Sequence, residues 1–293
     1  TKNLSQDELI ELYNEKYNDS FTIVSSGSEL WNAEYSEIIL KSSFLDQDVT
    51  VWIYEDGSMV DNYMAVKYKN ICQGMFKSRP NRFIANVEID GELTTVHVKN
   101  TGRCKELLTQ DATVYLEKSD NPSRKTAYDL VAVQKGKRLI NMDSQIPNKA
   151  VEEWIRSGGL LGKNPLVKAE SAFGKSRFDF YVESENSCRK AYVEVKGCTL
   201  ENDGVCMFPD APTERGVKHI KELAECVKSG YEAYIIFLIQ MNNVKYFTPN
   251  YDTHRAFGEA LAEEQKKGVT ILAFDSIVTP DSIGLNKPVE IRL

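Results

Sequence analysis

The sequence predicts a protein of mixed α and β structure in three parts. We expect an α+β module over residues 1–75, a five-stranded barrel of the oligonucleotide-binding type over residues 76–146, and an α/β domain with a central mixed sheet over residues 147–293. Two patterns predict this division. Apolar residues recur with a period of two after Phe83, and strand-like segments alternate with helix-like segments after Pro147. The length of 293 residues suits two or three domains.

The first part combines one helical pattern with several strand-like runs. Leu9, Ile10, Tyr13 and Tyr17 recur at helical spacing, with acidic residues in the first turn, which predicts a helix over residues 7–17. Strands are expected at 21–25, 36–42 and 49–54. After a turn at 55–57, Ser58 and Asp61 form a plausible capping pair, which predicts a helix from Ser58 to about Lys69. No catalytic pattern occurs in this part.

The middle part is rich in short alternating segments. Five strands are expected, at 82–89, 92–99, 112–118, 126–134 and 137–141. Asp90-Gly91 is a two-residue hairpin turn, Gly136 indicates a second turn, and a short helical turn fits at 103–108. Five strands in about 70 residues fit a partly open oligonucleotide-binding barrel, although other small barrels have the same number.

The last part alternates strands with helices. Pro147 opens a helix over about 148–157, which ends at Ser157-Gly158-Gly159. Further strands are expected at 166–171, 177–183, 190–196, 232–239 and 269–274, and helices at about 213–229 and 254–267.

Composition and charge narrow the classes of function. The apolar and charged fractions, 42% and 27%, are those of a globular protein, and no apolar run is long enough to span a bilayer, so we expect a cytoplasmic protein with no membrane partner. The six cysteines form no C-x-x-C pair, which argues against structural zinc. Net charge is −7, distributed as −8 over residues 1–70, +4 over 71–150 and −3 over 151–293. The middle part therefore has the field that favours phosphate.

Charged residues alternate with apolar ones on two strands of the last part. In segment 177–182 Arg177, Asp179 and Tyr181 share one face, opposite Phe178 and Phe180. In segment 191–197 Tyr192, Glu194 and Lys196 share one face. If the two strands are neighbours, Asp179, Glu194 and Lys196 converge. The simpler interpretation is an ordinary ion pair on a sheet surface, because ion-pair networks also produce such clusters.

Two close carboxylates repel, and a divalent cation is one remedy. Oxygen ligands of this kind suit Mg²⁺ or Mn²⁺, so we expect Asp179 and Glu194 to bind one of these ions. Lys196 would orient or deprotonate the attacking water and offset charge on a phosphate. A metal, a water and a cation are the parts that phosphodiester hydrolysis requires.

Several segments resemble a known family. The segments are FIANVEIDGELTTVHVKNTGRC at 83–104, YVEVKGCTL at 192–200, FPDAPTERGVKHIKEL at 208–223 and ILAF near the end. In order and content they resemble the sugar fermentation stimulation protein A family, over about residues 80–293. Residues 1–75 have no recognised counterpart in the shorter members.

The resemblance implies an oligonucleotide-binding-like barrel followed by a domain of the PD-(D/E)xK nuclease superfamily, and an association with DNA. The superfamily's first acid and its E-x-K motif match Asp179, Glu194 and Lys196. Glu170, on the preceding strand, is a possible further metal ligand or a solvated strand residue. Nuclease activity is common in the superfamily but not universal.

Other residues are candidates for binding nucleic acid. Arg215, Lys218 and His219 would line the first turns of a helix capped by Thr213, where cations and backbone N–H groups attract phosphate. Arg215 is the expected phosphate clamp, unless it pairs with a nearby acid, and His219 is either a proton shuttle or a structural residue. Further candidates are Arg177 near the catalytic group, the barrel cations Arg82, Arg103, Lys105, Arg124 and Lys125, and the base-stacking groups Phe83 and His97.

The sequence thus predicts a Mg²⁺- or Mn²⁺-dependent nuclease that cleaves DNA or RNA, with DNA the stronger candidate. The alternative is a non-catalytic DNA-binding regulator of sugar-metabolism genes built on a nuclease-like fold. Cys198 and Cys206 are expected to be packing residues, because no partner for a nucleophile is evident. The acidic first part could bind a protein or shield the basic barrel.

Overall fold

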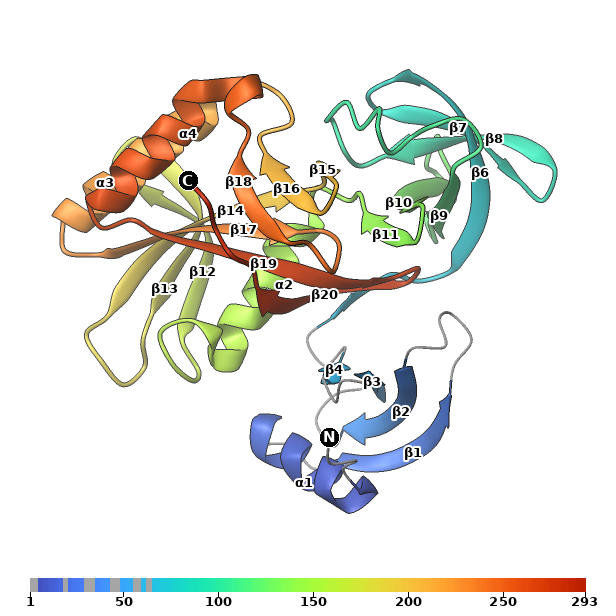
Figure 1. The fold of residues 1–293 in the computed structure, drawn as a ribbon, viewed down its shortest axis with the longest axis horizontal. Helices are drawn as coiled ribbons and strands as arrows, with labels where there is room; N and C mark the ends of the chain where they lie inside the picture. Colours follow the sequence, from blue (N-terminus) through green and yellow to red (C-terminus); the bar gives the residue numbers. More distant parts are fainter. Residues whose placement is uncertain (1–4, 18–20, 29–34, 43–47, 55–58, 62–64) are drawn as a thin grey trace. The chain divides into compact units, whose positions relative to one another are not determined.

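The computed structural model describes residues 5–17, 21–28, 35–42, 48–54, 59–61 and 65–293. The chain divides into two compact units, Thr1–Ala65 and Val66–Leu293 (Figure 1). In the described residues no helix has the length and apolar character needed to cross a membrane.

The first unit contains a helix and an antiparallel sheet. Helix α1 (Gln6–Tyr17) begins after Ser5, whose hydroxyl accepts from the N–H of Glu8 while the Glu8 carboxylate accepts from the N–H of Ser5. Strands β1 (Phe21–Ser28), β2 (Tyr35–Ser42), β3 (Asp48–Tyr54) and β4 (Met59–Asp61) pair in that order. Leu9 and Tyr13 of α1 are buried. The predicted helix over 7–17 and the first three strands are confirmed.

The predicted helix from Ser58 to Lys69 is wrong. Met59–Asp61 forms β4 and pairs with β3, and Val66–Lys67 forms β5, which pairs with β20 (Ser282–Pro288) in the second unit. Pairing with a strand that is already present satisfies the backbone of these short segments, so the local capping signal does not decide their structure. The predicted turn at 55–57 and the capping residue Ser58 lie outside the described residues.

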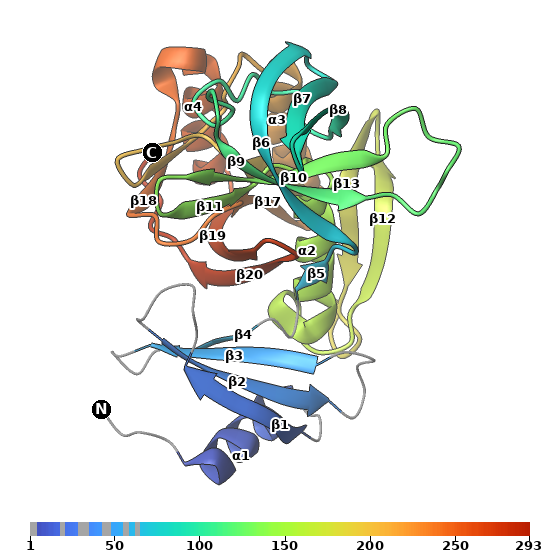
Figure 2. The same cartoon turned by 90° about the vertical axis from the view of Figure 1, so that its right-hand side faces the viewer.

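The second unit begins with a closed barrel. Its strands are β6 (Ile71–Asn81), β7 (Ile84–Ile89), β8 (Glu92–Val98), β9 (Thr113–Lys118) and β10 (Tyr128–Lys135), and β11 (Arg138–Asn141) extends β10 as a hairpin. Neighbours pair in the ring β6-β7-β8-β10-β9, and β9 pairs back with β6 (Figure 2). The buried residues of β7 alternate, as the period of two predicted. The predicted five-stranded barrel is therefore confirmed, but it is closed rather than partly open, and its fifth strand is β6 rather than the predicted strand at 137–141.

Strand β6 was not predicted. Its sequence lacks clean alternation and contains Gly74 and Pro80. A Cβ at Gly74 would lie 2.6 Å from Cγ1 of Val87 and 2.9 Å from the carbonyl oxygen of Glu88. Glycine is thus needed where β6 lies close against its neighbour β7, and the same glycine weakens the local strand signal.

A mixed sheet forms the centre of the last part. Its order is β12 (Leu166–Phe173), β13 (Ser176–Glu183), β14 (Lys190–Cys198), β17 (Glu232–Ile239), β19 (Thr270–Thr279), β20 and β5. β14, β17 and β19 are parallel, and β12, β13 and β20 are antiparallel to their neighbours. A smaller sheet is formed by β15 (Glu201–Asn202), β16 (Val205–Phe208) and β18 (Tyr246–Pro249). The sequence patterns did not predict β15, β16, β18 or β20.

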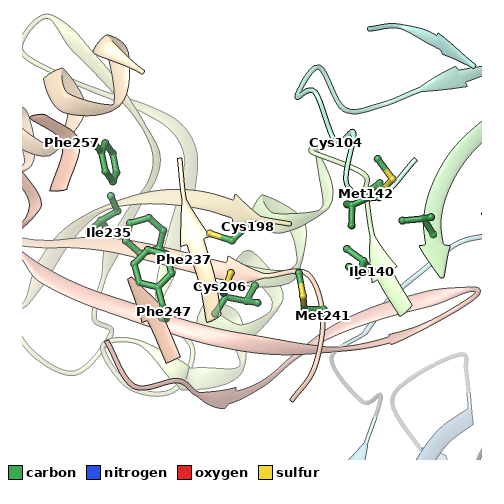
Figure 3. Packing of buried hydrophobic residues seen from close by; sticks show 14 of the residues in the cluster. Cys104, Ile140, Met142, Cys198, Cys206, Ile235, Phe237, Met241, Phe247 and Phe257 are labelled. Atoms are coloured by element: carbon green, nitrogen blue, oxygen red, sulfur yellow. The ribbon is translucent and has the colours of Figure 1, made fainter. Parts of the chain in front are cut away.

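Helices cover both faces of the large sheet. On one face Ile235 and Phe237 pack with apolar residues of α3 (Glu214–Lys228) and α4 (Tyr251–Lys266), including Phe257 (Figure 3). On the other, Val193 and Ile236 pack with α2 (Ile146–Trp154). Strand β17 is consequently buried on both sides, which explains its continuous apolar run.

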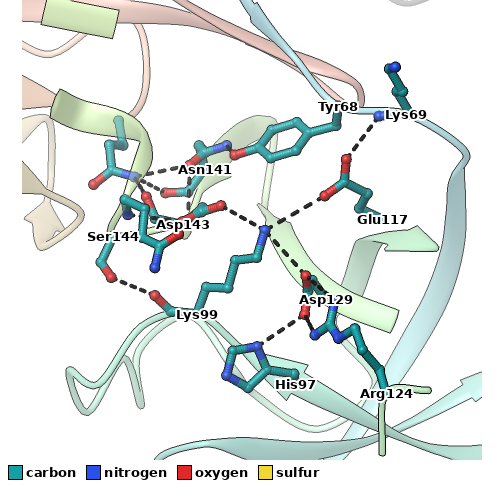
Figure 4. A network of polar contacts seen from close by, with 12 residues as sticks. Tyr68, Lys69, His97, Lys99, Glu117, Arg124, Asp129, Asn141, Asp143 and Ser144 are labelled. Carbon is teal, nitrogen blue, oxygen red and sulfur yellow. Dashed lines mark hydrogen bonds and ion pairs between the residues drawn. The ribbon is translucent and has the colours of Figure 1, made fainter. Parts of the chain in front are cut away.

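A polar network joins the barrel to the last part of the chain (Figure 4). Nζ of Lys99 lies 3.2 Å from Asp129 and 3.3 Å from Asp143. The side-chain amide of Asn141 donates to the hydroxyl of Tyr68, and its Oδ1 accepts from Nε2 of Gln240. Lys99 is half-buried, and the side chains that surround it in this network are buried and partnered, so together they fix the junction between the two parts of this unit.

Candidate active site

Asp179 lies where strands β13 and β14 separate. The strands pair at Phe180, opposite Val193. At the adjacent Asp179, the N–H of Val195 donates to Oδ2 at 2.7 Å, and Nδ2 of Asn148, on α2, donates to Oδ1 at 2.8 Å. One oxygen of the carboxylate is therefore held by strand β14 and the other by helix α2.

Glu194 and Lys196 meet next to this carboxylate. Nζ of Lys196 lies 2.5 Å from Oε1 of Glu194, and Nδ1 of His219, on α3, lies 2.5 Å from the same oxygen. Glu194 is buried, and Lys196 is half-buried. The structure thus brings together the E-x-K pair and His219, which the sequence placed in the first turns of a phosphate-binding helix as a proton shuttle or a structural residue.

The charges of the two carboxylates interact. Burial and the nearby charge of Glu194 raise the pKa of Asp179, and the hydrogen bonds from Val195 and Asn148 only partly offset this. Burial also opposes ionisation of Glu194, but hydrogen bonds from His219 and Lys196 outweigh it and lower the pKa of Glu194. A buried pair of this kind favours a cation between or beside its members.

The hydrogen bonds of His219 fix its tautomer. Nε of Arg215 lies 3.3 Å from Nε2 of His219. An arginine Nε can only donate, so Nε2 accepts and the ring proton resides on Nδ1, where it is donated to Glu194. Arg215, His219 and Glu194 therefore form a connected chain that orients the carboxylate.

The expected shared apolar face of Phe178 and Phe180 is not found. Phe178 packs against Tyr192 and His219 on the α3 side of the sheet, whereas Phe180 belongs to the cluster on the α2 side. Glu170 of β12, beside this point, has a positive φ of 52°, while the pairing of β12 with β13 keeps its register on both sides of it. The side chains of β13 do not alternate strictly between Phe178 and Phe180, so this expectation was wrong, although Asp179 is still close enough to Glu194 for the two charges to interact.

The structure does not bring Glu170 into a metal-binding group. Its side chain is 65% exposed and lies 3.7 Å from Arg177. Throughout the described part of the chain, no three His, Cys, Asp or Glu side chains are grouped so as to hold a metal. Asp179 and Glu194 still suit a hard dication, because Mg²⁺ is bound through one or two carboxylates and retains several waters.

An open cavity of about 560 Å³ lies beside this group. It is lined by Lys175, Ser176, Arg177, Glu214, Arg215, Lys218 and His219, and we call it the basic cleft. Four of these residues are Lys or Arg and one is acidic, so the cleft favours a phosphate. Arg177, Arg215, Lys218 and His219, each predicted from the sequence, are gathered here.

Three site residues were missed by the sequence patterns. Asn148 lies on a helix, 31 residues before Asp179. Nothing in its own segment of the sequence indicates that its side chain belongs to a site. Lys175 and Ser176 lie at the start of β13, just before the predicted strand. The only sequence signal for these residues was that two cations, Lys175 and Arg177, precede Asp179.

The barrel residues predicted to bind nucleic acid differ in whether a ligand can reach them. Arg82, Arg103 and Lys105 are exposed, and the guanidinium of Arg82 lies 5.2 Å from the ring centre of Phe83, which is 51% exposed. These groups are accessible to a ligand. By contrast, both terminal nitrogens of Arg124 bind Asp129, and His97 contacts the same carboxylate at 3.0 Å. Arg124 and His97 therefore belong to the network shown in Figure 4.

Cys198 and Cys206 are buried in the core (Figure 3). Burial and the neighbouring Cys206 raise the pKa of Cys198. A thiol that stays protonated is a poor nucleophile, which agrees with the expected packing role.

Comparison with known proteins gives a consistent match. Residues 78–142 match the SfsA N-terminal OB domain, and residues 145–282 match the sugar fermentation stimulation protein RE domain. A sugar fermentation stimulation protein homolog of Ruminiclostridium cellulolyticum is 58% identical over 228 residues, which are 78% of this chain and 100% of the relative. A homolog of Clostridium beijerinckii is 55% identical with the same coverage. A solved structure, described as Pyrococcus furiosus SfsA in complex with Ca²⁺, is 26% identical with a TM-score of 0.70 and covers 78% of this chain and 98% of that one.

Proposed function

This chain belongs to the sugar fermentation stimulation protein family, and we propose that it is a divalent-metal-dependent nuclease that hydrolyses phosphodiester bonds of DNA or RNA. The observation that carries the proposal is the meeting of Glu194 and Lys196 beside the partnered Asp179, next to the basic cleft. The OB domain supports nucleic-acid binding, because barrels of this type bind oligonucleotides.

Asp179 and Glu194 would hold Mg²⁺ or Mn²⁺. When bound, such an ion polarises a phosphoryl oxygen and lowers the pKa of a water. The description of the Pyrococcus furiosus protein as a Ca²⁺ complex supports an oxygen-lined site, since Ca²⁺ and Mg²⁺ both prefer oxygen ligands.

The chain's own residues have separate roles in this proposal. Lys196 orients the attacking water and offsets the charge that develops on the phosphate. Arg215 holds the phosphate in the basic cleft. Asn148 and the N–H of Val195 keep Asp179 in place, and His219 does the same for Glu194.

The test is direct cleavage. Purified protein with Mg²⁺ or Mn²⁺ should cut at least one of single-stranded DNA, double-stranded DNA, flapped DNA and RNA. Lys196→Ala should reduce the rate at least 100-fold while nucleic-acid affinity changes little. Lys163→Ala, at an exposed position outside the cleft, is the control. Failure of the wild-type protein to cut any of these substrates would contradict the proposal.

One observation favours a second candidate, a DNA-binding regulator without catalysis. Protein donors already satisfy both oxygens of Asp179 and one oxygen of Glu194, so this group can persist as a structural unit. Titration calorimetry with Mn²⁺ separates the two candidates. The enzyme should show a site that is lost in Asp179→Ala, whereas the regulator should bind DNA with strong salt dependence and no requirement for metal.

A further inference from the structure

A second cavity, of about 180 Å³, lies between a barrel loop and the end of strand β14. It shares no lining residue with the basic cleft and begins at Gly197, the residue after Lys196. Its walls are Asn100, Thr101, Gly102, Ser144, Gly197, Cys198, Thr199, Leu200, Met207, Phe208, Asp210 and Gln240. We call it the junction pocket.

The floor of the junction pocket presents a fixed hydrogen-bond acceptor. Gln240 is 1% exposed, and its Nε2 donates to both oxygens of Asn141 and to the carbonyl of Asp143. The amide orientation is thereby fixed, and Oε1 lies against Gly197, where a Cβ would be 2.5 Å away. Because Nε2 makes these three bonds, Oε1 is the side of the amide that faces Gly197 and can act as an acceptor.

The opposite wall carries a carboxylate and an amide. A Cβ at Gly102 would lie 2.5 Å from Oδ2 of Asp210 and 2.9 Å from Oδ1 of Asn100. Oδ1 of Asn100 accepts from the N–H of Gly102, which leaves Nδ2 as a donor. Glycine at positions 102 and 197 is therefore needed for these polar groups to approach the backbone.

An aromatic ring completes the pocket. Phe208 is half-buried, and its ring is held by Phe237 at 5.6 Å and Phe257 at 5.1 Å between centroids. A cavity of about 150 Å³ accommodates a benzene ring, so about 180 Å³ is enough for a single substituted ring. A rigid aromatic wall with acceptors and one donor around it suits a planar heterocycle.

We propose that the junction pocket receives one unstacked pyrimidine base, with cytosine preferred over thymine, from a strand bound by the barrel. The exocyclic amino group of cytosine would donate to Asp210, as carboxylates do to this group in DNA recognition, whereas thymine would present a carbonyl oxygen to the carboxylate. Asn100 Nδ2 would donate to the ring acceptors, and Phe208 would contact the ring face. The inference rests on the proposed nucleic-acid binding and specifies its substrate as single-stranded or locally opened.

Binding without divalent metal tests the pocket independently of cleavage. Fluorescence anisotropy in EDTA would compare ten-nucleotide strands of deoxycytidine and of deoxythymidine. The wild-type protein should bind deoxycytidine about tenfold more tightly than deoxythymidine, because one well-placed base contact corresponds to roughly a 5- to 150-fold difference. Asp210→Asn should reduce that preference to about twofold or less while leaving the salt dependence unchanged. Asp203→Asn, the same change at an exposed turn position, should behave as wild type.

Equal affinity of the wild-type protein for the deoxycytidine and deoxythymidine strands would overturn the inference. So would an Asp210→Asn protein with the preference of Asp203→Asn. If the preference holds but no substrate is cut with Mg²⁺ or Mn²⁺, the pocket stands and the nuclease proposal falls. If a substrate is cut but no base preference is found, the nuclease proposal stands and the pocket inference falls.

Discussion

His219 and Glu194 lie 25 residues apart in the chain and are joined by a hydrogen bond of 2.5 Å between Nδ1 and Oε1. Because Arg215 donates to the other ring nitrogen, His219 can act as a fixed donor that orients the carboxylate. This makes His219 a positioning residue for the proposed metal site, comparable to the outer-shell partners of known metal ligands.

Replacing His219 should weaken metal binding and cleavage more than it lowers the stability of the fold. We expect His219→Ala to reduce Mn²⁺ affinity or the cleavage rate by about 10- to 100-fold, because Glu194 loses its orienting partner. Calorimetry and cleavage at increasing Mn²⁺ concentrations measure this, and high Mn²⁺ should restore part of the rate. His219→Gln, which can still donate, should lose less. Equal losses in the two variants, with no recovery at high Mn²⁺, would argue against a positioning role.

Replacing Arg215 should weaken binding to all nucleic-acid sequences alike. Arg215 is exposed in the basic cleft, so Arg215→Ala removes one phosphate contact and should lower the slope of log affinity against log salt by about 1. Affinity measurements at several salt concentrations check this. Arg255→Ala removes an exposed arginine of α4, 73% exposed, outside the cleft and is the matched control. An unchanged slope in Arg215→Ala would show that this side chain does not contact phosphate.

The site residues that could be predicted from the sequence differ for a physical reason from those that could not. Alternation along β14 places Glu194 and Lys196 on one face, because the period of a strand is local. Along β13 the alternation fails, because Phe178 and Phe180 pack on opposite sides of the sheet. Asn148 could not be found in this way, since its contact with Asp179 depends on how α2 packs on the sheet. The positive φ of Glu170 likewise has no glycine or proline in the sequence to predict it.

The same distinction applies to the fold. The strands with clear alternation and the amphipathic helix α3 were expected close to their observed ends. Strand β6 was missed because its close approach to β7 requires Gly74, which weakens the strand signal. Strand β4 was taken for part of a helix because the capping signal is local, whereas its pairing with β3 is not. The junction pocket combines loops from both parts of the second unit, so no single segment predicts it.

The buried carboxylate of Asp129 should contribute to stability in a pH-dependent way. Burial opposes its ionisation, but hydrogen bonds from Arg124 and the charge of Lys99 outweigh burial and lower the pKa of Asp129 to about 2. A folded-state pKa below the ordinary value of 3.8 stabilises the protein above about pH 4, and this contribution is lost as pH falls from about 4 toward 2.

We therefore expect Asp129→Asn to lower the free energy of unfolding at pH 7 by about 3 kcal/mol, because Arg124 and Lys99 lose a buried partner. Urea unfolding at pH 7, 5 and 3 measures the difference from wild type, which should be similar at pH 7 and 5 and smaller at pH 3. Asp90→Asn, in an exposed Asp-Gly turn that accepts Asn equally well, should change stability little. A difference that stays constant down to pH 3 would show that Asp129 is not the titrating group.

The acidic first unit should reduce affinity for nucleic acid. Residues 1–65 contain 3 Lys and 13 Asp and Glu, so their removal changes the net charge from −7 to +3. Residues 66–293 form a compact unit of 228 residues, the same length as the fully covered match in the Ruminiclostridium cellulolyticum relative, so we expect them to fold alone. The shortened protein should bind a single-stranded decamer several-fold more tightly at low salt, and the gain should shrink as salt screens the charge. Anisotropy at low and physiological salt measures this, with circular dichroism to verify folding. Unchanged affinity at low salt in a folded protein would exclude an electrostatic shielding role and leave binding of another protein as the remaining hypothesis for this unit.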